Sequence, residues 1–199
     1  MSIKQLLPSV NPCVPRMGNA ITRFLGRLLL KLLGWRVSGE LPELKQVIVM
    51  VAPHTSNWDF ITAMAALSGA GVKWSYLMKK EAFFFPFKTF FMNMGGVPID
   101  RSQTEGLVEQ VADAFQQREK LWLALTPEGT RKKVSSYKTG FLRIAHLSKV
   151  PILIVAWNYP TKEIVLDRIW ETTDDIAQDA TAIQEYINKH YTGRHPEQQ

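Results

Sequence analysis

The chain lacks most of the features that would mark a secreted or membrane-spanning protein. A single cysteine, Cys13, among 199 residues excludes an internal disulfide and a thiolate-rich zinc site. Two of its longest stretches without a charged residue, 60–72 and 150–161, fall short of the roughly 20 apolar residues that a membrane span needs. Prolines interrupt residues 1–15, so this segment has no apolar core of the secretory type. We therefore expect a protein of a reducing compartment without a membrane span.

Negative charge is also scarce relative to positive charge, which leaves a formal net charge of +6 at pH 7. This balance favours an anionic partner such as nucleic acid, an acidic membrane surface, or a phosphorylated or CoA-type substrate. A basic protein without any polyanionic partner is the alternative. No nucleic-acid-binding module is recognisable, so we expect no nucleic-acid partner.

Apolar runs and amphipathic stretches alternate along a chain that is long enough for one domain. Short apolar runs predict strands at 47–51, 74–78, 96–99, 121–125, 152–157 and 163–169. Helical periodicity predicts helices at 57–70, 81–94 (bent or restarted at Pro86), 104–119, 140–147 and 173–191. The alternation favours a single α/β domain with a mixed, mostly parallel β-sheet flanked by helices. We divide the chain into an irregular N-terminus (1–15), an amphipathic helix (16–35) and a main domain (36–199).

Residues 16–35 have the pattern of a basic amphipathic helix. Apolar side chains recur at three- and four-residue steps at Ile21, Phe24, Leu25, Leu28 and Leu32. Cations recur on a shared face at Arg16, Arg23, Arg27 and Lys31. Such helices lie in a membrane interface, with the apolar face among acyl chains and the cations near anionic headgroups. A helix docked on the protein core has the same periodicity and remains the alternative.

An aromatic run follows in the middle of the chain, with lysines on either side. Its members are Phe83, Phe84, Phe85, Phe87, Phe90 and Phe91. One amphipathic helix cannot bury so many rings in a small domain, so some of them are predicted to line an apolar tunnel or to meet lipid. A purely structural aromatic cluster is the alternative.

The strongest candidate for chemistry is the segment 53–59, which reads PHTSNWD. It follows a predicted buried strand and opens a helix, the place where α/β proteins build their sites. Asp59 lies in the first helical turn, so its carboxylate can fold back toward His54. A carboxylate on one imidazole nitrogen leaves the other nitrogen as a proton acceptor. The alternative is that Asp59 only favours the helix N-terminus electrostatically.

A second candidate is the segment 126–133, which reads TPEGTRKK and also follows a predicted strand. Gly129 permits a close approach of the backbone to a ligand. Arg131 offers a planar fork suited to phosphate, and the two lysines add point charges. A solvated surface loop is the alternative.

Two weaker segments complete the set. Residues 95–101 read GGVPIDR, with paired glycines that suggest a turn or a close approach and with Arg101 as a further cation. Residues 150–153 read VPIL and are compatible with nothing more than the start of a core strand.

In this order the four segments resemble the glycerolphosphate acyltransferase family, and most closely its 1-acylglycerol-3-phosphate (lysophosphatidate) acyltransferase branch. The matching motifs are His54–Asp59, Gly95–Arg101, Pro127–Arg131 and Val150–Ile152. The resemblance covers roughly residues 35–170. It implies an acyltransferase domain at 36–199 and an O-acyltransferase of phospholipid biosynthesis.

The resemblance also implies roles for individual residues. His54, oriented by Asp59, is the general base that takes the proton of the acceptor hydroxyl, which then attacks the thioester without an acyl-enzyme. The acceptor phosphate is expected to be held by Arg101, Glu128, Gly129, Thr130 and Arg131. Backbone N–H groups near Val150 and Pro151 are expected to support the oxyanion.

The expected partners are a lysophospholipid acceptor, an acyl-CoA or acyl-carrier-protein donor, and an anionic membrane surface. We expect no cofactor and no metal, since the remaining histidines, His146, His190 and His195, have no paired carboxylate at metal spacing. The expected location is the cytoplasmic face of a membrane, as a peripheral or monotopic protein.

Two departures from the family pattern affect the acceptor. Pro53 precedes the histidine where the family often has Asn or Ser, and Thr126 precedes Pro127 where an aromatic residue is usual. Another lysolipid acceptor is therefore an alternative for the same chemistry. A peripheral membrane-binding protein without catalysis is the alternative from a different class.

Overall fold

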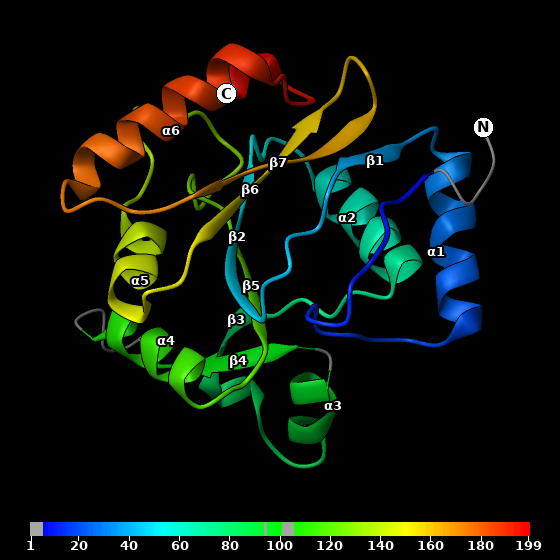
Figure 1. Cartoon of the computed structure of the whole chain (residues 1–199), viewed down its shortest axis with the longest axis horizontal. Helices are drawn as coiled ribbons and strands as arrows, with labels where there is room; N and C mark the ends of the chain where they lie inside the picture. Colours follow the sequence, from blue (N-terminus) through cyan, green and yellow to red (C-terminus); the bar gives the residue numbers. More distant parts are fainter. Residues whose placement is uncertain (1–5, 94, 101–105) are drawn as a thin grey trace.

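A computed structural model describes residues 6–93, 95–100 and 106–199, and a five-stranded sheet runs through its middle (Figure 1). The strands are β1 (Arg36–Gly39), β2 (Gln46–Ala52), β5 (Leu121–Leu125), β6 (Ile152–Asn158) and β7 (Glu163–Trp170). Their order across the sheet is β1-β7-β6-β2-β5. All neighbours are parallel except β6 and β7, which form an antiparallel pair. The predicted mixed, mostly parallel sheet is confirmed.

A small parallel sheet continues the architecture beyond β5. It consists of β3 (Tyr76–Lys79) and β4 (Gly96–Ile99). Ser75, just before β3, forms a parallel bridge with Leu123 of β5. The small sheet is thereby attached to the edge of the large one.

Helices cover both faces of the large sheet (Figure 1). One layer contains α1 (Ala20–Leu32) and α2 (Asn57–Ala70), and the other contains α4 (Leu107–Gln116), α5 (Gly140–Ser148) and α6 (Ile176–His190). The short α3 (Phe87–Asn93) follows a 3-10 turn at Lys80–Ala82, and a second 3-10 turn lies at Pro196–Gln198. Two buried apolar clusters, one under each layer, form the core.

Local sequence determines where α2 begins and ends. Ser56 is the N-cap: its hydroxyl accepts a hydrogen bond from the Trp58 N–H, and the Asp59 carboxylate accepts one from the Ser56 N–H. This reciprocal capping box satisfies N–H groups that a helix start leaves free. Gly71 ends the helix with φ 71°, a left-handed conformation that favours glycine.

The predicted elements agree with the structure in kind, and their ends differ by a few residues. The amphipathic helix is shorter than 16–35, because Asn19 caps it and it ends at Leu32. In the aromatic segment the helix begins just after Pro86, where a bend or restart was predicted, and the part before Pro86 forms only a 3-10 turn. Strand β1 was not predicted.

Helix α1 packs closely on α2 and leaves its apolar stripe uncovered. Gly26 is buried against Ala65 and Gly69 of α2. The exposed apolar side chains of α1 are Ile21, Phe24, Leu25, Leu29 and Leu32. Leu32 is 75% exposed, which is unusual for a leucine in a docked helix. Within the described residues, no helix is long and apolar enough to cross a membrane.

Candidate active site

The candidate base lies at the carboxyl end of the sheet. His54 follows β2, which pairs in parallel with β5 and β6 on its two sides. The loop after β5 begins at Thr126, so the two strongest sequence candidates come from adjacent parallel strands. Because such strands end at the same edge of a sheet, their loops meet there.

His54 and Asp59 are in direct contact. The His54 Nδ1 lies 3.0 Å from the Asp59 Oδ2. The Asp59 carboxylate is fully buried, whereas 22% of the His54 side chain is exposed. An ionised Asp59 accepts a hydrogen bond from Nδ1–H, and this tautomer leaves Nε2 with a free lone pair. The arrangement suits general-base chemistry at Nε2.

Asp59 is held in place by several donors besides His54. The backbone N–H groups of Thr55 and Ser56 donate to Oδ2 at 3.0 and 2.9 Å. The Tyr159 hydroxyl donates to Oδ1 at 2.5 Å. Asp59 therefore closes the capping box of α2 and also contacts the imidazole, so its contacts are not limited to the helix N-terminus.

Tyr159 is a site residue that the sequence did not reveal. It follows β6, a hundred residues after Asp59. Its ring lies edge-on to Trp35, with centroids 4.8 Å apart. Burial and the hydrogen bond to Asp59 raise the pKa of Tyr159, so the hydroxyl keeps its proton and acts as a donor. No motif or spacing in the chain points to this contact, which depends on the path of β6 beside β2.

Glu128 contacts the backbone of the loop that carries His54. Its Oε1 accepts a hydrogen bond from the His54 backbone N–H at 3.1 Å. Its Oε2 is buried without a hydrogen-bond partner among the described residues. Burial raises the pKa of the Glu128 carboxyl, and two backbone hydrogen bonds partly oppose this. The Glu128 side chain contacts the His54 loop and is not among the residues that line the cleft described below, so its expected contact with phosphate stays a prediction.

A surface cleft of about 400 Å³ opens beside the histidine. It is lined by His54, Asn57, Phe60, Thr126, Gly129, Thr130 and Arg131. Thus Gly129, Thr130 and Arg131 share one cleft with the candidate base, and all three are exposed. Arg101 lies outside the described residues.

The oxyanion role expected for Val150 and Pro151 is wrong. Both precede β6, where Ile152 pairs with Ile48, while the end of the strand near His54 pairs Ala156 with Ala52. They therefore lie at the amino-terminal ends of the parallel strands, whereas His54 lies at their carboxyl-terminal ends. The Val150 N–H already donates to Ala145 O at 3.1 Å, and proline has no N–H to offer.

The C-terminal segment also contacts the residues that follow His54. The His195 backbone N–H donates to Thr55 Oγ1 at 3.2 Å. The Arg194 guanidinium lies 5.1 Å above the Trp58 ring. Residues near the end of the chain thus contact the loop between His54 and Asp59, which the local pattern could not indicate.

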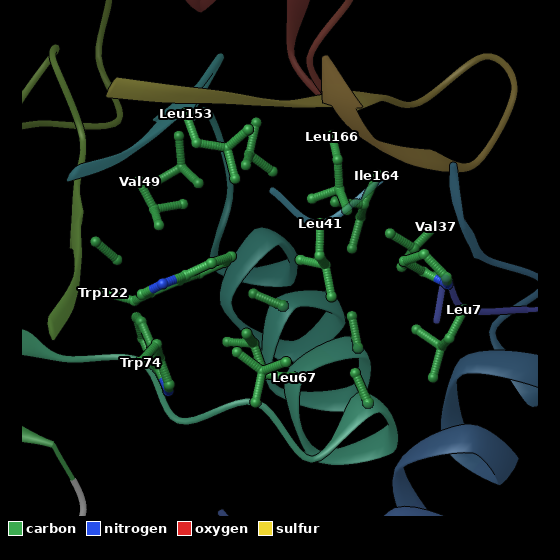
Figure 2. A pocket seen from close by; sticks show the side chains of 18 of the residues that line it. Leu7, Val37, Leu41, Val49, Leu67, Trp74, Trp122, Leu153, Ile164 and Leu166 are labelled. Atoms are coloured by element: carbon green, nitrogen blue, oxygen red, sulfur yellow. The ribbon is translucent and has the colours of Figure 1, made fainter. Parts of the chain in front are cut away.

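An apolar cavity lies between the sheet and α2 (Figure 2). It encloses about 120 Å³. Figure 2 shows Leu67 of α2, Leu153 and Leu166 of the sheet, and Trp74 and Trp122 around the same space. The remaining lining is Leu7, Pro8, Val37, Leu41, Val49, Val51, Ala63, Ala66, Ala70, Val72, Ala124, Val155, Trp157 and Ile164.

The indole N–H groups of two tryptophans around this cavity donate hydrogen bonds within the protein. The Trp122 Nε1–H donates to Leu44 O at 3.0 Å, and the Trp157 Nε1–H donates to Thr62 Oγ1 at 2.9 Å. Trp157 also lies 6.4 Å from His54 between ring centroids. Trp157 thus lines the apolar cavity and also lies near His54.

The described residues contain no group of three His, Cys, Asp or Glu side chains that could hold a metal ion. The cleft itself offers the His54 imidazole and the Arg131 guanidinium, and the buried Asp59 carboxylate contacts the imidazole from within the fold.

Comparison with known proteins adds a family and a fold. A family model described as Acyltransferase matches residues 35–157, which include His54, Asp59 and the segment 126–131. A solved structure, the 1-acyl-sn-glycerophosphate (LPA) acyltransferase PlsC from Thermotoga maritima, aligns with a TM-score of 0.54 over 87% of this chain and 80% of that chain. The two share 17% sequence identity, so this likeness concerns the fold. No curated protein matches the chain.

Proposed function

Because the chain belongs to the acyltransferase family, we propose that it transfers a fatty acyl chain from an acyl thioester to the hydroxyl of 1-acylglycerol-3-phosphate. The observation that carries the proposal is the 3.0 Å contact between His54 and Asp59 at a cleft that Arg131 also lines. The donor is acyl-CoA or acyl-carrier protein. The same reaction on another lysolipid is the alternative.

The chemical step uses the imidazole twice. His54 Nε2 takes the proton of the acceptor hydroxyl as its oxygen attacks the thioester carbonyl carbon. The C–O bond forms, the C–S bond breaks, and the departing thiolate receives the proton from Nε2. Asp59 stabilises the imidazolium that exists between the two transfers. The step needs no metal and no cofactor.

The loop after β5 would bind the acceptor phosphate. Arg131 supplies a bidentate donor, and Gly129 and Thr130 bring backbone and hydroxyl groups into the same cleft. Arg101 is proposed as a second cation for this phosphate. The PlsC protein of similar fold is a 1-acyl-sn-glycerophosphate (LPA) acyltransferase, which supports a phosphate-bearing acceptor.

The apolar cavity would hold an acyl chain during the reaction. Its lining is apolar, and Trp157 connects it with the surroundings of His54. An acyl chain that enters such a cavity leaves water, which contributes about 0.8 kcal/mol for each buried CH₂.

The protein would work at the surface of a membrane. The exposed stripe of α1 and the exposed rings of Phe60, Phe84 and Phe85 offer apolar area to lipid. The net positive charge favours an anionic leaflet. We place the protein at the cytoplasmic face as a peripheral or monotopic enzyme.

Product analysis tests the proposal. Purified protein is incubated with palmitoyl-CoA or palmitoyl-carrier protein and a panel of lysophosphatidate, lysophosphatidylcholine and lysophosphatidylglycerol, and lipids are identified by mass spectrometry. The proposal predicts phosphatidate as the dominant product. A dominant product from another acceptor would establish the alternative, and binding to vesicles without any acyl transfer would favour a non-catalytic membrane protein.

A further inference from the structure

A surface groove beside α1 contains three arginines that take no part in the proposed acyl transfer. Arg16, Arg23 and Arg27 line a hollow of about 480 Å³ with residues 7–10 and Ala70. Among the described residues, none of these arginines forms an ion pair with a carboxylate. We refer to this hollow as the arginine groove. Its three positive charges remain uncompensated by the described part of the chain.

The fold uses only a small part of this donor capacity. Arg16 donates one hydrogen bond to Val10 O at 3.0 Å, and Arg27 donates one to Gly69 O at 2.9 Å. The Nε of Arg23 is buried without a hydrogen-bond partner among the described residues. A guanidinium has five N–H donors, and a buried donor without a partner is costly. An anion in the groove would relieve that cost and the mutual repulsion of the cations.

The arginine groove adjoins the apolar cavity. Leu7, Pro8 and Ala70 line both spaces. This junction lies at the C-terminal end of α2, while His54 precedes its N-terminal end. Fourteen helical residues separate the two ends by about 20 Å, at 1.5 Å per residue. The cavity therefore has cations at the end remote from the candidate base.

We propose that the arginine groove binds the anionic head, a phosphate or carboxylate, of a single-chain amphiphile whose tail enters the apolar cavity. Cations at the edge of an apolar cavity match the chemistry of such a molecule, with a charged head on one side and hydrocarbon on the other. This site is distinct from the cleft that Arg131 lines. The proposed function places an acyl chain in the same apolar cavity, so the tail of the amphiphile would compete with it. That competition rests on the proposed function, whereas binding of the amphiphile does not.

Calorimetric titration with dodecyl phosphate, kept below its micellar concentration, tests the site directly. Dodecanoate replaces it to compare carboxylate with phosphate, inorganic phosphate tests the head alone, and dodecanol tests the tail alone. The key variant is Arg23→Gln, since the Arg23 guanidinium has no hydrogen bond among those described for the fold. Lys31→Gln, on the same helix but outside the groove, is the matched control for charge.

The proposal predicts that Arg23→Gln weakens dodecyl phosphate binding about tenfold, the loss expected for one charge-assisted contact. Lys31→Gln and Arg131→Gln should stay within about twofold of the parent chain. Dodecanol should bind the parent and Arg23→Gln equally. Ala70→Leu, which narrows the shared opening, should weaken dodecyl phosphate more than inorganic phosphate.

Three results would overturn the proposal. Unchanged dodecyl phosphate binding by a folded Arg23→Gln variant would show that Arg23 does not contact the anionic head. Weakening by Arg131→Gln instead would place the head in the cleft beside His54. Equal affinity for inorganic phosphate and dodecyl phosphate would exclude the cavity as the site of the tail. Because no turnover is measured, a failure of the proposed reaction would not affect these readings.

Discussion

The Tyr159 hydroxyl donates a hydrogen bond to Asp59 Oδ1, while His54 Nδ1 contacts the other carboxylate oxygen of the same residue. The two oxygens of one buried carboxylate thus connect the candidate base with the residue that directly follows β6. Neither oxygen is free to rotate away without breaking a hydrogen bond. The imidazole orientation is therefore fixed by a network rather than by one pair.

Tyr159→Phe should lower kcat by about tenfold and leave KM nearly unchanged, because the phenol contacts Asp59 and not the cleft. Loss of one buried hydrogen bond should also lower the free energy of unfolding by about 1–3 kcal/mol. Steady-state kinetics of Tyr159→Phe, Asp59→Asn and the double variant provide the check. If Tyr159 acts independently of Asp59, the fold-loss in kcat of the double variant equals the product of the two single losses, whereas a shared network makes the double loss smaller than that product.

Glu128 should make stability pH-dependent. Burial raises the pKa of its carboxyl in the folded chain above the value in the unfolded chain, so the folded state holds the proton more tightly. The contribution of Glu128 is therefore largest below pH 4.5 and is lost as pH rises through the folded pKa. Relative to the parent, Glu128→Gln should become more stable as pH increases from 4 to 8 in urea unfolding. A difference that does not vary with pH would contradict this account.

Glu128→Ala provides the complementary test of the same carboxyl. It removes the acceptor of the His54 backbone N–H, which is partly buried. The free energy of unfolding should fall by about 1–3 kcal/mol near pH 4 and by less as pH rises, and acyl transfer should fall with it, because the loop that carries the base loses its support. Retention of full activity by Glu128→Ala would show that the loop does not need this contact.

The junction of α1 with α2 depends on Gly26. A Cβ at this position would lie 2.4 Å from Gly69 N and 2.8 Å from Ala65 O, which are backbone atoms that cannot move aside. Gly26→Ala should lower the free energy of unfolding by about 1–3 kcal/mol as the helices separate. Gly140→Ala is the matched control, since a Cβ there meets nothing within 4 Å. Equal thermal stability of both variants would contradict the close packing of the helices.

The exposed stripe of α1 should determine membrane binding. Phe24 and Leu32 are 56% and 75% exposed, so replacing both with serine should leave folding unchanged. Partitioning onto phosphatidylglycerol vesicles in a sedimentation assay should fall at least about tenfold, because each side chain contributes about 1.5–3 kcal/mol when buried in apolar surroundings. Leu147→Ser, an equivalent change on α5 in the opposite helix layer, should have no effect. An equal loss with Leu147→Ser would exclude α1 as the binding surface.

Local patterns in the chain were sufficient for most of the fold. The apolar runs of β2, β5 and β6 are rich in residues that prefer buried strands, and they were predicted with nearly correct ends. Strand β1 was missed because its sequence, RVSG, has one apolar side chain and ends in glycine. Its strand conformation comes from pairing with β7, a tertiary contact that no local pattern encodes.

The candidate site likewise contains contacts that the local sequence predicts and contacts that it does not predict. The pairing of His54 with Asp59 was predictable, since a capping box requires the N3 side chain to fold back over the helix start. The place of Val150 was predicted wrongly, because a motif gives an order along the chain but not the edge of the sheet at which it lies. Tyr159 and the backbone of His195 reach the site only through the path of the chain after β6 and α6.

The rate of CoA release from palmitoyl-CoA in the presence of lysophosphatidate, compared between the parent chain and His54→Ala, tests the central claim most directly. A general base typically contributes about 10²- to 10⁴-fold, so the variant should release CoA at least about a hundredfold more slowly while it remains folded by circular dichroism. A His54→Ala variant that releases CoA at the parental rate would contradict the assignment of His54 as the base.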